Sequence, residues 1–311
     1  MEEIIIRSMV SQDVNYLLKK GYPFSIDFLR PKKTFKIRFF YLIDRLFGGC
    51  PRKRFTLVAC PKNRRAIGSI TYLSFGSSIW LTGPLFVAPQ YRRNQLGFRF
   101  VKEANKKLEE MGIQKAYGDV PVDNPSRQIH SKLGAAFLDH TLSADLNKRI
   151  LPANPEIILE RISQKEIDKD TKLILYDSFS DIVSLEMRNF FEKGPESFLS
   201  PHNRFFCHTN PQLLKIDEIV AIRKERDCSF AILFSIRASQ MRHSDIYLQD
   251  PEDAIALVPV ISSQATFGPL SSRLFVRSGT LKALKRLQEI FQGLKIQASI
   301  DETMVYHFEG S

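Results

Sequence analysis

The chain has 311 residues, which favours two domains, and its 43% of hydrophobic residues is enough for buried cores. No apolar run approaches the roughly 18 to 20 residues that span a bilayer, so we expect no transmembrane segment. The first residues, two acids before a short apolar strand, do not read as a signal peptide, and we expect a cytoplasmic protein.

The formal net charge is +11, and many of the basic residues cluster locally rather than in one tail. The clusters lie at 30–38, 50–54 and 61–65. A positive balance of this size suits a polyanionic partner, such as a nucleic acid, an anionic membrane or a phosphorylated ligand. Simple solubility is the alternative interpretation.

The four cysteines are widely spaced and include no C-x-x-C pair. This spacing indicates neither a zinc ribbon nor a redox motif, so reduced thiols are the preferred interpretation. Cys207 and His208 lie near His202 in the sequence, but their spacing fits no common metal site. We therefore expect no metal.

The first half of the chain alternates between strand and helix patterns. Strands are expected at 3–9, 55–60, 66–75, 79–87, 113–122 and 135–146, and helices at 11–22, 98–112 and 124–134. Gly83 and Pro84 interrupt the fourth strand, because proline inside a strand marks a break or a bulge. The helix at 98–112 is amphipathic and ends at Gly112, a favourable stop.

The pattern restarts after a proline-containing linker at 151–156. Residues 157–179 repeat the layout of the N-terminus, with a strand, a polar break and a helix. Further strands are expected at 218–224, 229–238, 254–263, 294–301 and 304–310, with an amphipathic helix at 279–293. We therefore predict two domains, 1–150 and 151–311, of which the second is a diverged copy of the first or an unrelated α+β domain.

The segment 91–97, "YRRNQLG", joins the interrupted strand to the amphipathic helix. The start of a helix exposes unpaired N–H groups and the positive end of the dipole, and a tight loop can aim these groups at an anion. Gly97 permits a close approach, while Arg92 and Arg93 add charge. These features suit a pyrophosphate, although most helix starts bind nothing.

Residues 81–137 resemble the core of the GNAT N-acetyltransferase superfamily, in which a strand, a [Q/R]-x-x-G-x-[G/A] loop, a helix, a further strand and an Asn-led helix follow one another. Arg92 matches the first position of the loop and Gly97 the last, while Gln95 stands where the first glycine is expected. The resemblance covers about residues 1–145. It implies an α+β fold with a mixed, mostly antiparallel sheet flanked by helices, and two tandem units if the second half is a degenerate copy.

The resemblance also implies a cofactor and its site. An acyl-CoA, most simply acetyl-CoA, would bind with its pyrophosphate on the loop and its pantetheine arm beside the strand backbone. The residues implied to bind it are Leu85, Phe86, Val87, Arg92, Arg93, Asn94, Gln95, Leu96, Gly97 and Asn124. The reaction would be the direct attack of an amine on the thioester, which needs a proton acceptor and a donor for the thioester oxygen.

Members of the family often place a tyrosine on the second helix as the acid for the leaving thiolate. The resemblance puts His130 at this position, and a histidine can serve as acid or base near neutral pH. A surface or capped histidine is the alternative. The carboxylate expected on the strand before the loop is absent, which leaves Thr82, Asp119 and Asp123 as other polar groups near the site.

Three functions stay open from the sequence: an acyl-CoA-dependent N-acyltransferase, a non-catalytic CoA-binding or adaptor protein on the same scaffold, and a nucleic-acid-associated protein. The corresponding segment of the second half, taken as 276–287, lacks the loop, so we expect that half to have lost the cofactor. Acceptor loops in this scaffold come from 27–49, which is basic and aromatic. The acceptor is unknown, with a hint of an acidic or apolar molecule.

Overall fold

The structure, a computed structural model, describes the chain with gaps. The described residues are 4–10, 12–13, 16–17, 54–61, 65–75, 77–81, 85–92, 95–145, 160–163, 167–191, 214–223, 228–236, 242–250, 253–254, 256–257, 259, 273–278 and 280–308. The chain divides into unit 1, which contains Met1–Phe137 and Thr303–Ser311, and unit 2, which contains Leu138–Glu302. The domain boundary predicted near residue 150 stays a prediction.

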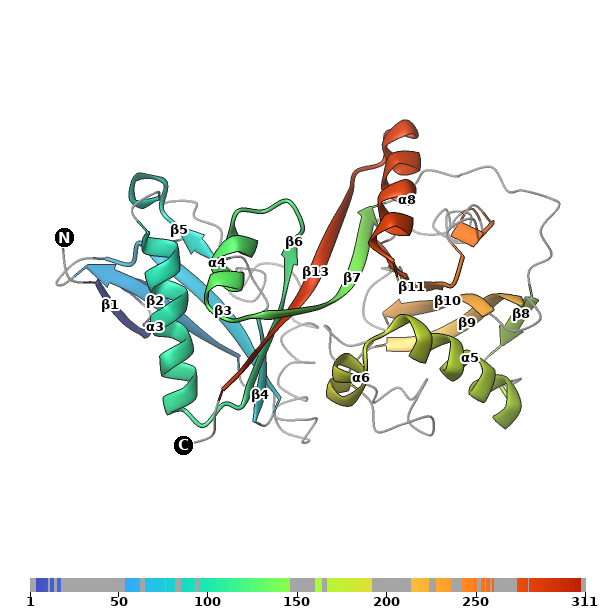
Figure 1. Ribbon diagram of the computed structural model, residues 1–311, viewed down its shortest axis with the longest axis horizontal. Helices are drawn as coiled ribbons and strands as arrows, with labels where there is room; N and C mark the ends of the chain where they lie inside the picture. Colours follow the sequence, from blue (N-terminus) through green and yellow to red (C-terminus); the bar gives the residue numbers. More distant parts are fainter. Residues whose placement is uncertain are drawn as a thin grey trace. The chain divides into compact units, whose positions relative to one another are not determined.

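Unit 1 is built on a mixed sheet with the strand order β1-β2-β3-β4-β6-β13 (Figure 1). Its strands are β1 (Ile4–Ser8), β2 (Arg54–Pro61), β3 (Gly68–Phe75), β4 (Ser78–Leu81), β5 (Phe86–Val87), β6 (Lys115–Pro121) and β13 (Ala298–His307), of which β5 pairs with β3 off this path. Neighbours from β1 to β4 are antiparallel, whereas β4 and β6 are parallel. The residues of β13 from Thr303 onward belong to this unit.

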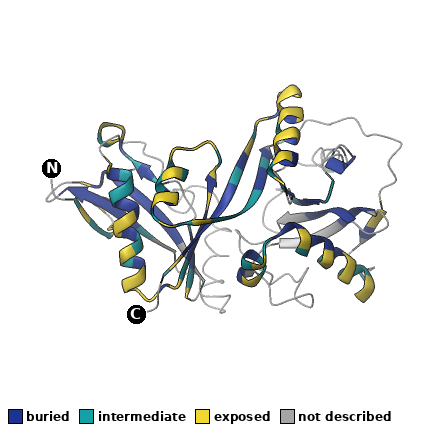
Figure 2. Ribbon diagram, viewed as in Figure 1, coloured by how far each residue is buried: buried dark blue, intermediate teal, exposed yellow. Residues whose placement is uncertain are grey.

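The long helix α3 (Leu96–Glu110) packs against this sheet and begins at the candidate site. Its apolar side chains recur every three or four residues, so Phe100, Ala104 and Leu108 are fully buried while the opposite face is exposed (Figure 2). Gly112 follows the helix with a φ of 73°, a conformation that favours glycine. The prediction of a helix at 98–112 is confirmed to within two residues at each end.

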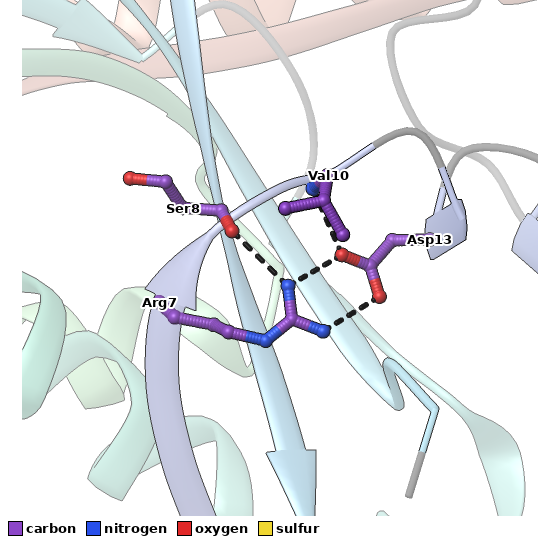
Figure 3. Close-up of polar contacts among 4 residues, drawn as sticks. All are labelled: Arg7, Ser8, Val10 and Asp13. Carbon is purple, nitrogen blue, oxygen red and sulfur yellow. Dashed lines mark hydrogen bonds and ion pairs between the residues drawn. The ribbon is translucent and has the colours of Figure 1, made fainter.

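An ion pair ties β1 to the helical residues at 12–13 that follow it (Figure 3). Arg7 Nη1 and Nη2 donate to Asp13 Oδ2 and Oδ1 at 2.6 and 2.9 Å, and the Val10 amide donates to Oδ2 at 2.9 Å. Burial raises the pKa of the Asp13 carboxyl, but these hydrogen bonds outweigh burial and hold the pKa below its usual value. Asp13 therefore stays ionised near neutral pH and holds these helical residues to β1.

Unit 2 has the strand order β13-β7-β12-β11-β10-β9-β8. Its strands besides β13 are β7 (Ala136–Asp145), β8 (Glu160–Ser163), β9 (Leu214–Arg223), β10 (Cys228–Ile236), β11 (Arg242–Leu248) and β12 (Arg273–Ser278), and its helices are α5 (Lys169–Ile182), α6 (Leu185–Phe191) and α8 (Leu281–Gly293). The Asp168 carboxylate caps α5 by accepting from the Thr171 amide at 2.7 Å. The fold class predicted from the sequence, α+β with two tandem units, is confirmed.

The two units share one order of elements. In the first half of the chain the hairpin β3-β4 is followed by β5, by α3, by β6 parallel to β4, by helix α4 (Ser126–Lys132) and by β7, most of which belongs to unit 2. In unit 2 the hairpin β10-β11 is followed by helical residues, by β12 parallel to β11, by α8 and by β13. The order of elements is therefore the same in both units, with α8 in the place of α4; that unit 2 is a diverged copy of unit 1 stays a prediction.

Two predictions for the second half need correction. A strand was expected at 254–263, but the described residues there, Ala254, Ala256, Leu257 and Pro259, are helical. A short continuous apolar run does not distinguish a buried helix from a strand. The strands expected at 294–301 and 304–310 form one strand, β13, because the polar residue Glu302 is buried beside His140 at 3.2 Å and does not end it.

In the part of the chain that the structure describes, no helix has both the length and the apolar character that crossing a membrane requires.

Candidate functional site

Among the described residues, the ladder between β4 and β6 is shorter than β6 itself. It runs to Leu81 and Gly118, whereas β6 continues to Pro121. The next strand, β5, pairs with β3 at Gly68 and Ser69 and shows no ladder to β6 among the described residues. No described strand other than β3 therefore pairs with β5, although the Val87 carbonyl oxygen already accepts from Arg92.

A cavity of about 830 Å³ lies at the start of α3 and α4. It is lined by Leu85, Val87, Arg92, Gln95, Leu96, Gly97, Phe98, Asn124, Pro125, Ser126, Gln128, Ile129 and Lys132. Arg92 and Lys132 are cationic, and none of these described lining residues is acidic. The volume falls in the range typical of small-molecule sites, and the charge suits an anionic ligand with an apolar part.

The first turn of α3 gives the cavity its anion-binding character. Leu96, Gly97 and Phe98 line the cavity, and a helix leaves the N–H groups of its first turn without acceptors inside the helix. The first bond that closes the helix runs from the Arg99 amide to the Gln95 carbonyl at 3.0 Å. The free N–H groups and the positive end of the dipole therefore face the cavity.

Gln95 precedes α3 in a left-handed conformation, with φ of 56° and ψ of 10°. This region favours glycine, because a Cβ atom there crowds the backbone. The sequence marked this position as a glycine slot filled by glutamine, and the backbone has the conformation that a glycine would adopt. The loop thus keeps its shape at the expense of local strain.

Replacing Gln95 by glycine is expected to raise the melting temperature by about 2–4 °C, because relief of the left-handed strain contributes roughly 1 kcal/mol. Thermal unfolding checks this expectation. Lys295, with φ of 58° after α8, provides the matched control, since Lys295→Gly relieves the same strain in unit 2. A lower melting temperature for Gln95→Gly would show that the glutamine side chain stabilises the loop.

Arg92 is fixed by a bond to the strand beside it. Its Nε atom donates to the Val87 carbonyl oxygen at 2.9 Å, while most of the side chain is exposed. The bond spans the loop from its start to the end of β5. It holds the guanidinium group at the cavity while leaving its other N–H groups for a ligand.

The α4 wall begins at Asn124. Its Oδ1 atom accepts from the Ser126 amide at 2.8 Å, and its carbonyl oxygen accepts from the Arg127 amide at 2.9 Å. A Cβ atom added to Gly97 would lie 3.3 Å from Ile129 Cδ1, so α3 and α4 approach closely at this glycine. Any larger side chain at position 97 must therefore displace Ile129 or project into the cavity.

The structure brings together seven of the residues expected at the cofactor site. Those that line the cavity are Leu85, Val87, Arg92, Gln95, Leu96, Gly97 and Asn124. The side chain of Phe86 is instead buried in the core, 4% exposed, as the alternation of a strand requires. Arg93 and Asn94 lie outside the described residues, as does Thr82.

His130 points into the core rather than to the cavity. It is 2% exposed, and its Nδ1 atom lies 2.8 Å from the hydroxyl oxygen of Tyr306. Burial lowers the pKa of His130 to about 4, so the imidazole is neutral at neutral pH. Its neighbours Gln128 and Ile129 line the cavity.

The other polar groups noted near the site are placed differently. Asp119 is exposed one residue beyond the last β4–β6 pair, and its Oδ1 atom accepts from the Thr303 hydroxyl at 2.9 Å. Asp123 is exposed just before α4. Among the described residues, no group of three histidine, cysteine or acidic side chains could hold a metal ion, and Cys207, His208 and His202 lie outside them.

Sequence reasoning missed several cavity residues. Ser126, Ile129 and Lys132 follow one another at intervals of three, so they lie on one face of α4, and this spacing would have indicated them. Phe98, Pro125 and Gln128 complete the missed set. Tyr306 carried no local signal, because it stands 176 residues from His130.

The order of elements also corrects the counterpart of the loop in unit 2. The sequence comparison placed it at 276–287, but these residues cover parts of β12 and α8. The segment between β11 and the helical residue Ala254 holds the equivalent position, and it reads "QDPED" at 249–253. This loop carries three acidic residues where unit 1 carries two arginines, so it is unsuited to a phosphate.

Comparison with known proteins agrees with the fold of the first half of the chain. The model of the Acetyltransferase (GNAT) family matches residues 22–135, which places a GNAT acetyltransferase domain there and confirms the resemblance seen in the sequence. No curated protein matches the sequence.

Solved structures that resemble this chain match nearly its full length. A GCN5-related N-acetyltransferase from Sphaerobacter thermophilus is 12% identical with a TM-score of 0.52, covering 99% of this chain and 97% of that one. A tandem GNAT protein from the clavulanic acid biosynthesis pathway is 9% identical with a TM-score of 0.48, over 99% of this chain and 100% of that one. A putative acetyltransferase from Pyrococcus horikoshii is 13% identical with a TM-score of 0.45, over 100% and 91%.

Proposed function

We propose that the GNAT domain of this chain is an N-acyltransferase that uses an acyl-CoA, most simply acetyl-CoA, and transfers the acyl group to an amine. One observation carries the proposal: a cavity of about 830 Å³ joins the N–H groups at the start of α3 to strand β5. An acyl-CoA has the matching division into an anionic pyrophosphate and a largely uncharged arm that ends in the thioester.

Each wall of the cavity has a part in this proposal. The loop from Arg92 to Gly97, including Arg93 and Asn94, holds the pyrophosphate through backbone N–H groups, with Arg92 and Lys132 adding positive charge. The backbone of Leu85, Phe86 and Val87 runs beside the pantetheine arm, and Asn124 lies at the entrance to α4.

A bound acyl-CoA supplies an activated thioester to the amine. The amine nitrogen forms a bond to the carbonyl carbon, the carbon–sulfur bond breaks, and one proton leaves the nitrogen. The backbone of β5 supplies donors to the region where negative charge develops on the carbonyl oxygen. The cavity itself supplies the cations but no carboxylate, so the proton acceptor comes from outside its described lining or from water.

His130 remains our candidate for proton transfer, with a narrower role than the sequence suggested. Its imidazole is neutral at neutral pH, because burial lowers its pKa to about 4, and its Nδ1 atom contacts the Tyr306 hydroxyl. A proton exchanged with the site would pass through the Tyr306 hydroxyl or the other ring nitrogen. The pH profile of kcat/KM tests this role.

Unit 2 is proposed to bind no cofactor. The acidic segment 249–253 stands where unit 1 has its arginines, which opposes phosphate binding. The acceptor stays unidentified, because the basic and aromatic region 27–49 lies outside the described residues. We place the protein in the cytoplasm, as expected from the sequence.

Binding of CoA tests the proposal directly. At a CoA concentration about 100 times its Kd, the folded state gains roughly 2.7 kcal/mol, which for a protein of this size raises the melting temperature by about 5–10 °C. The variant Arg92→Glu is expected to lose most of this shift, because it removes a cation from the cavity and adds an anion. Differential scanning fluorimetry with and without CoA measures both.

Lys106→Glu is the matched control, because it makes the same change of charge at an exposed position of α3, roughly 15 Å along the helix from its start. Lys106→Glu should keep the rise in melting temperature that CoA binding causes in the wild-type protein. The proposal fails if no acyl-CoA stabilises the wild-type protein, or if Arg92→Glu and Lys106→Glu respond alike.

A CoA-binding protein without turnover is the second candidate. The absence of a carboxylate among the described lining residues and the burial of His130 favour it. Incubation with radiolabelled acetyl-CoA and a panel of amines separates the two: labelled product on any amine shows the enzyme, and binding without product shows the alternative. No contact of the described residues favours nucleic-acid binding, which stays a prediction from the net charge.

A further inference from the structure

Three polar side chains meet in the apolar core of unit 1. Tyr306 of β13 is 6% exposed, and its hydroxyl oxygen lies 2.8 Å from His130 Nδ1 and 3.4 Å from the His130 carbonyl oxygen. The side chain of Asn105 forms a hydrogen bond with the same hydroxyl. The cluster of Tyr306, His130 and Asn105 therefore joins β13, α4 and α3 at one oxygen atom.

The members of this cluster stand on the two helices that form the walls of the cavity. Asn105 lies two turns after Gly97 on α3, at a spacing of eight residues, so the two residues share one face of the helix. His130 follows Gln128 and Ile129 on α4, and Ile129 approaches Gly97 closely. The two helices contact each other. The cluster therefore links the two helices that line the cavity.

The strand that carries Tyr306 is itself held in place. The Thr303 hydroxyl donates to Asp119 at 2.9 Å, and the Phe308 amide donates to the Gln114 carbonyl at 2.8 Å. The ring of Phe308 stacks on that of Tyr306, with centroids 6.3 Å apart and planes 8° from parallel. Tyr306 thus has a fixed ring from which its hydroxyl can orient the helices.

We propose that Tyr306 is a positioning residue for acyl-CoA: its hydroxyl, held between Asn105 of α3 and His130 of α4, sets the separation of the two helices that line the cofactor cavity. The inference rests on the proposed function. It assigns a role in cofactor binding to Tyr306 of β13, 171 residues beyond the end of the family match at 22–135.

The chemistry of the cluster explains why the hydroxyl is needed. A neutral histidine offers one donor and one acceptor nitrogen, and a tyrosine hydroxyl can donate to or accept from Nδ1 while it also accepts from the amide of Asn105. Phenylalanine fills the same volume but leaves the buried nitrogen and the amide without this partner. The His130 ring and the Asn105 amide would then form hydrogen bonds with other groups, and α4 would shift relative to α3.

The test compares Tyr306→Phe with wild type at a temperature where both are folded. Titration calorimetry with CoA is expected to show an affinity about 5- to 20-fold weaker for the variant, and hydrogen exchange of the α4 amides is expected to be faster without CoA. Asn105→Ala, which cuts the link from α3, should weaken CoA binding in the same direction and serves if Tyr306→Phe does not fold.

Tyr247→Phe is the matched control, because Tyr247 is fully buried in unit 2 and lies outside the cavity. It should leave CoA affinity unchanged, whatever its effect on melting temperature. Equal CoA affinity and equal exchange of the α4 amides in wild type and Tyr306→Phe would overturn the positioning role. Failure of wild-type protein to bind any CoA would instead overturn the proposed function together with this inference.

Two replacements of His130 test the same hydrogen bond from the side of α4. Asparagine places an amide near the position of Nδ1, so His130→Asn should keep CoA affinity within about threefold, whereas His130→Leu should weaken it as Tyr306→Phe does. Equal weakening by both replacements would contradict a positioning role that acts through this hydrogen bond.

Discussion

Gly97→Glu is expected to abolish measurable CoA binding, with an affinity more than 100-fold weaker than that of wild type. Gly97 lines the cavity in the first turn of α3, and a Cβ atom there would already lie 3.3 Å from Ile129 Cδ1. A longer side chain must enter the cavity, where its carboxylate repels the phosphates and competes for the same N–H groups. Titration calorimetry with CoA measures the effect.

Two further variants distinguish the effects of side-chain charge and size on CoA binding from a general loss of folding. Gly97→Gln has nearly the same size without the charge, so the difference between the two variants isolates electrostatic repulsion. Gly293→Glu makes the same substitution at the exposed end of α8, where nothing lies within 4 Å of the added Cβ atom. Binding by Gly97→Glu within threefold of wild type would place the cofactor elsewhere.

His130 is expected to give the folded protein a pH dependence of stability of roughly 3 kcal/mol between pH 7 and pH 4. Its pKa falls from 6.5 to about 4 on folding, because burial disfavours the charged ring. The unfolded chain then binds a proton that the folded chain does not, so this contribution is fully present above pH 6.5 and is lost as the pH falls toward 4.

Other groups also change protonation between pH 4 and pH 7. The pH dependence of wild-type stability alone therefore does not isolate the contribution of His130. Burial raises the pKa of Asp245 to about 6 despite the charge of Arg277, and this group makes stability fall as the pH rises from 3.8 to 6. The informative quantity is therefore the difference in the free energy of unfolding between wild type and His130→Asn. Urea unfolding at several pH values measures it. A constant difference across pH 4 to 7 would contradict the burial of an uncharged His130.

The same variant tests the proposed proton transfer. A histidine with a pKa of about 4 gives no titration between pH 6 and 7, so we expect neither the kcat/KM profile nor the NMR signal of His130 to show a step there. A step near pH 6.5 that disappears in His130→Asn would show instead that the ring reaches the solvent and takes part directly. Equal kcat in wild type and His130→Asn would leave His130 as a positioning residue only.

Patterns over a few residues predicted helix α3 and some of the residues that line the cavity. The three- and four-residue recurrence in α3 placed that helix to within two residues, and the order of motifs predicted that Arg92, Gly97 and Asn124 share one site. Such features depend on neighbours a few residues apart, which the sequence displays directly. The same reasoning identified Gln95 as an unusual residue, because it stands where a glycine is expected. Its φ of 56° is the left-handed conformation that favours glycine.

The interpretation of His130 depended on contacts that no local pattern contains. Its position on a short helix suited either a catalytic or a capped residue, and the choice depends on which way the side chain points. Tyr306 supplies the partner from a strand at the far end of the chain, 176 residues away. Apolar burial of Tyr306 and His130 in one core then lowers the pKa of the ring.

The sequence by itself determined the α+β class, the repeated order of strand and helix, and the loop that opens α3, because backbone preferences and hydrophobic spacing act over short distances. Only the tertiary structure decided that 254–259 is helical where described, that β13 is one strand, and that Phe86 and His130 face the core. These outcomes depend on which surfaces are buried together. Burial and hydrogen bonding between distant segments set them, and the chain carries that information only when it is folded.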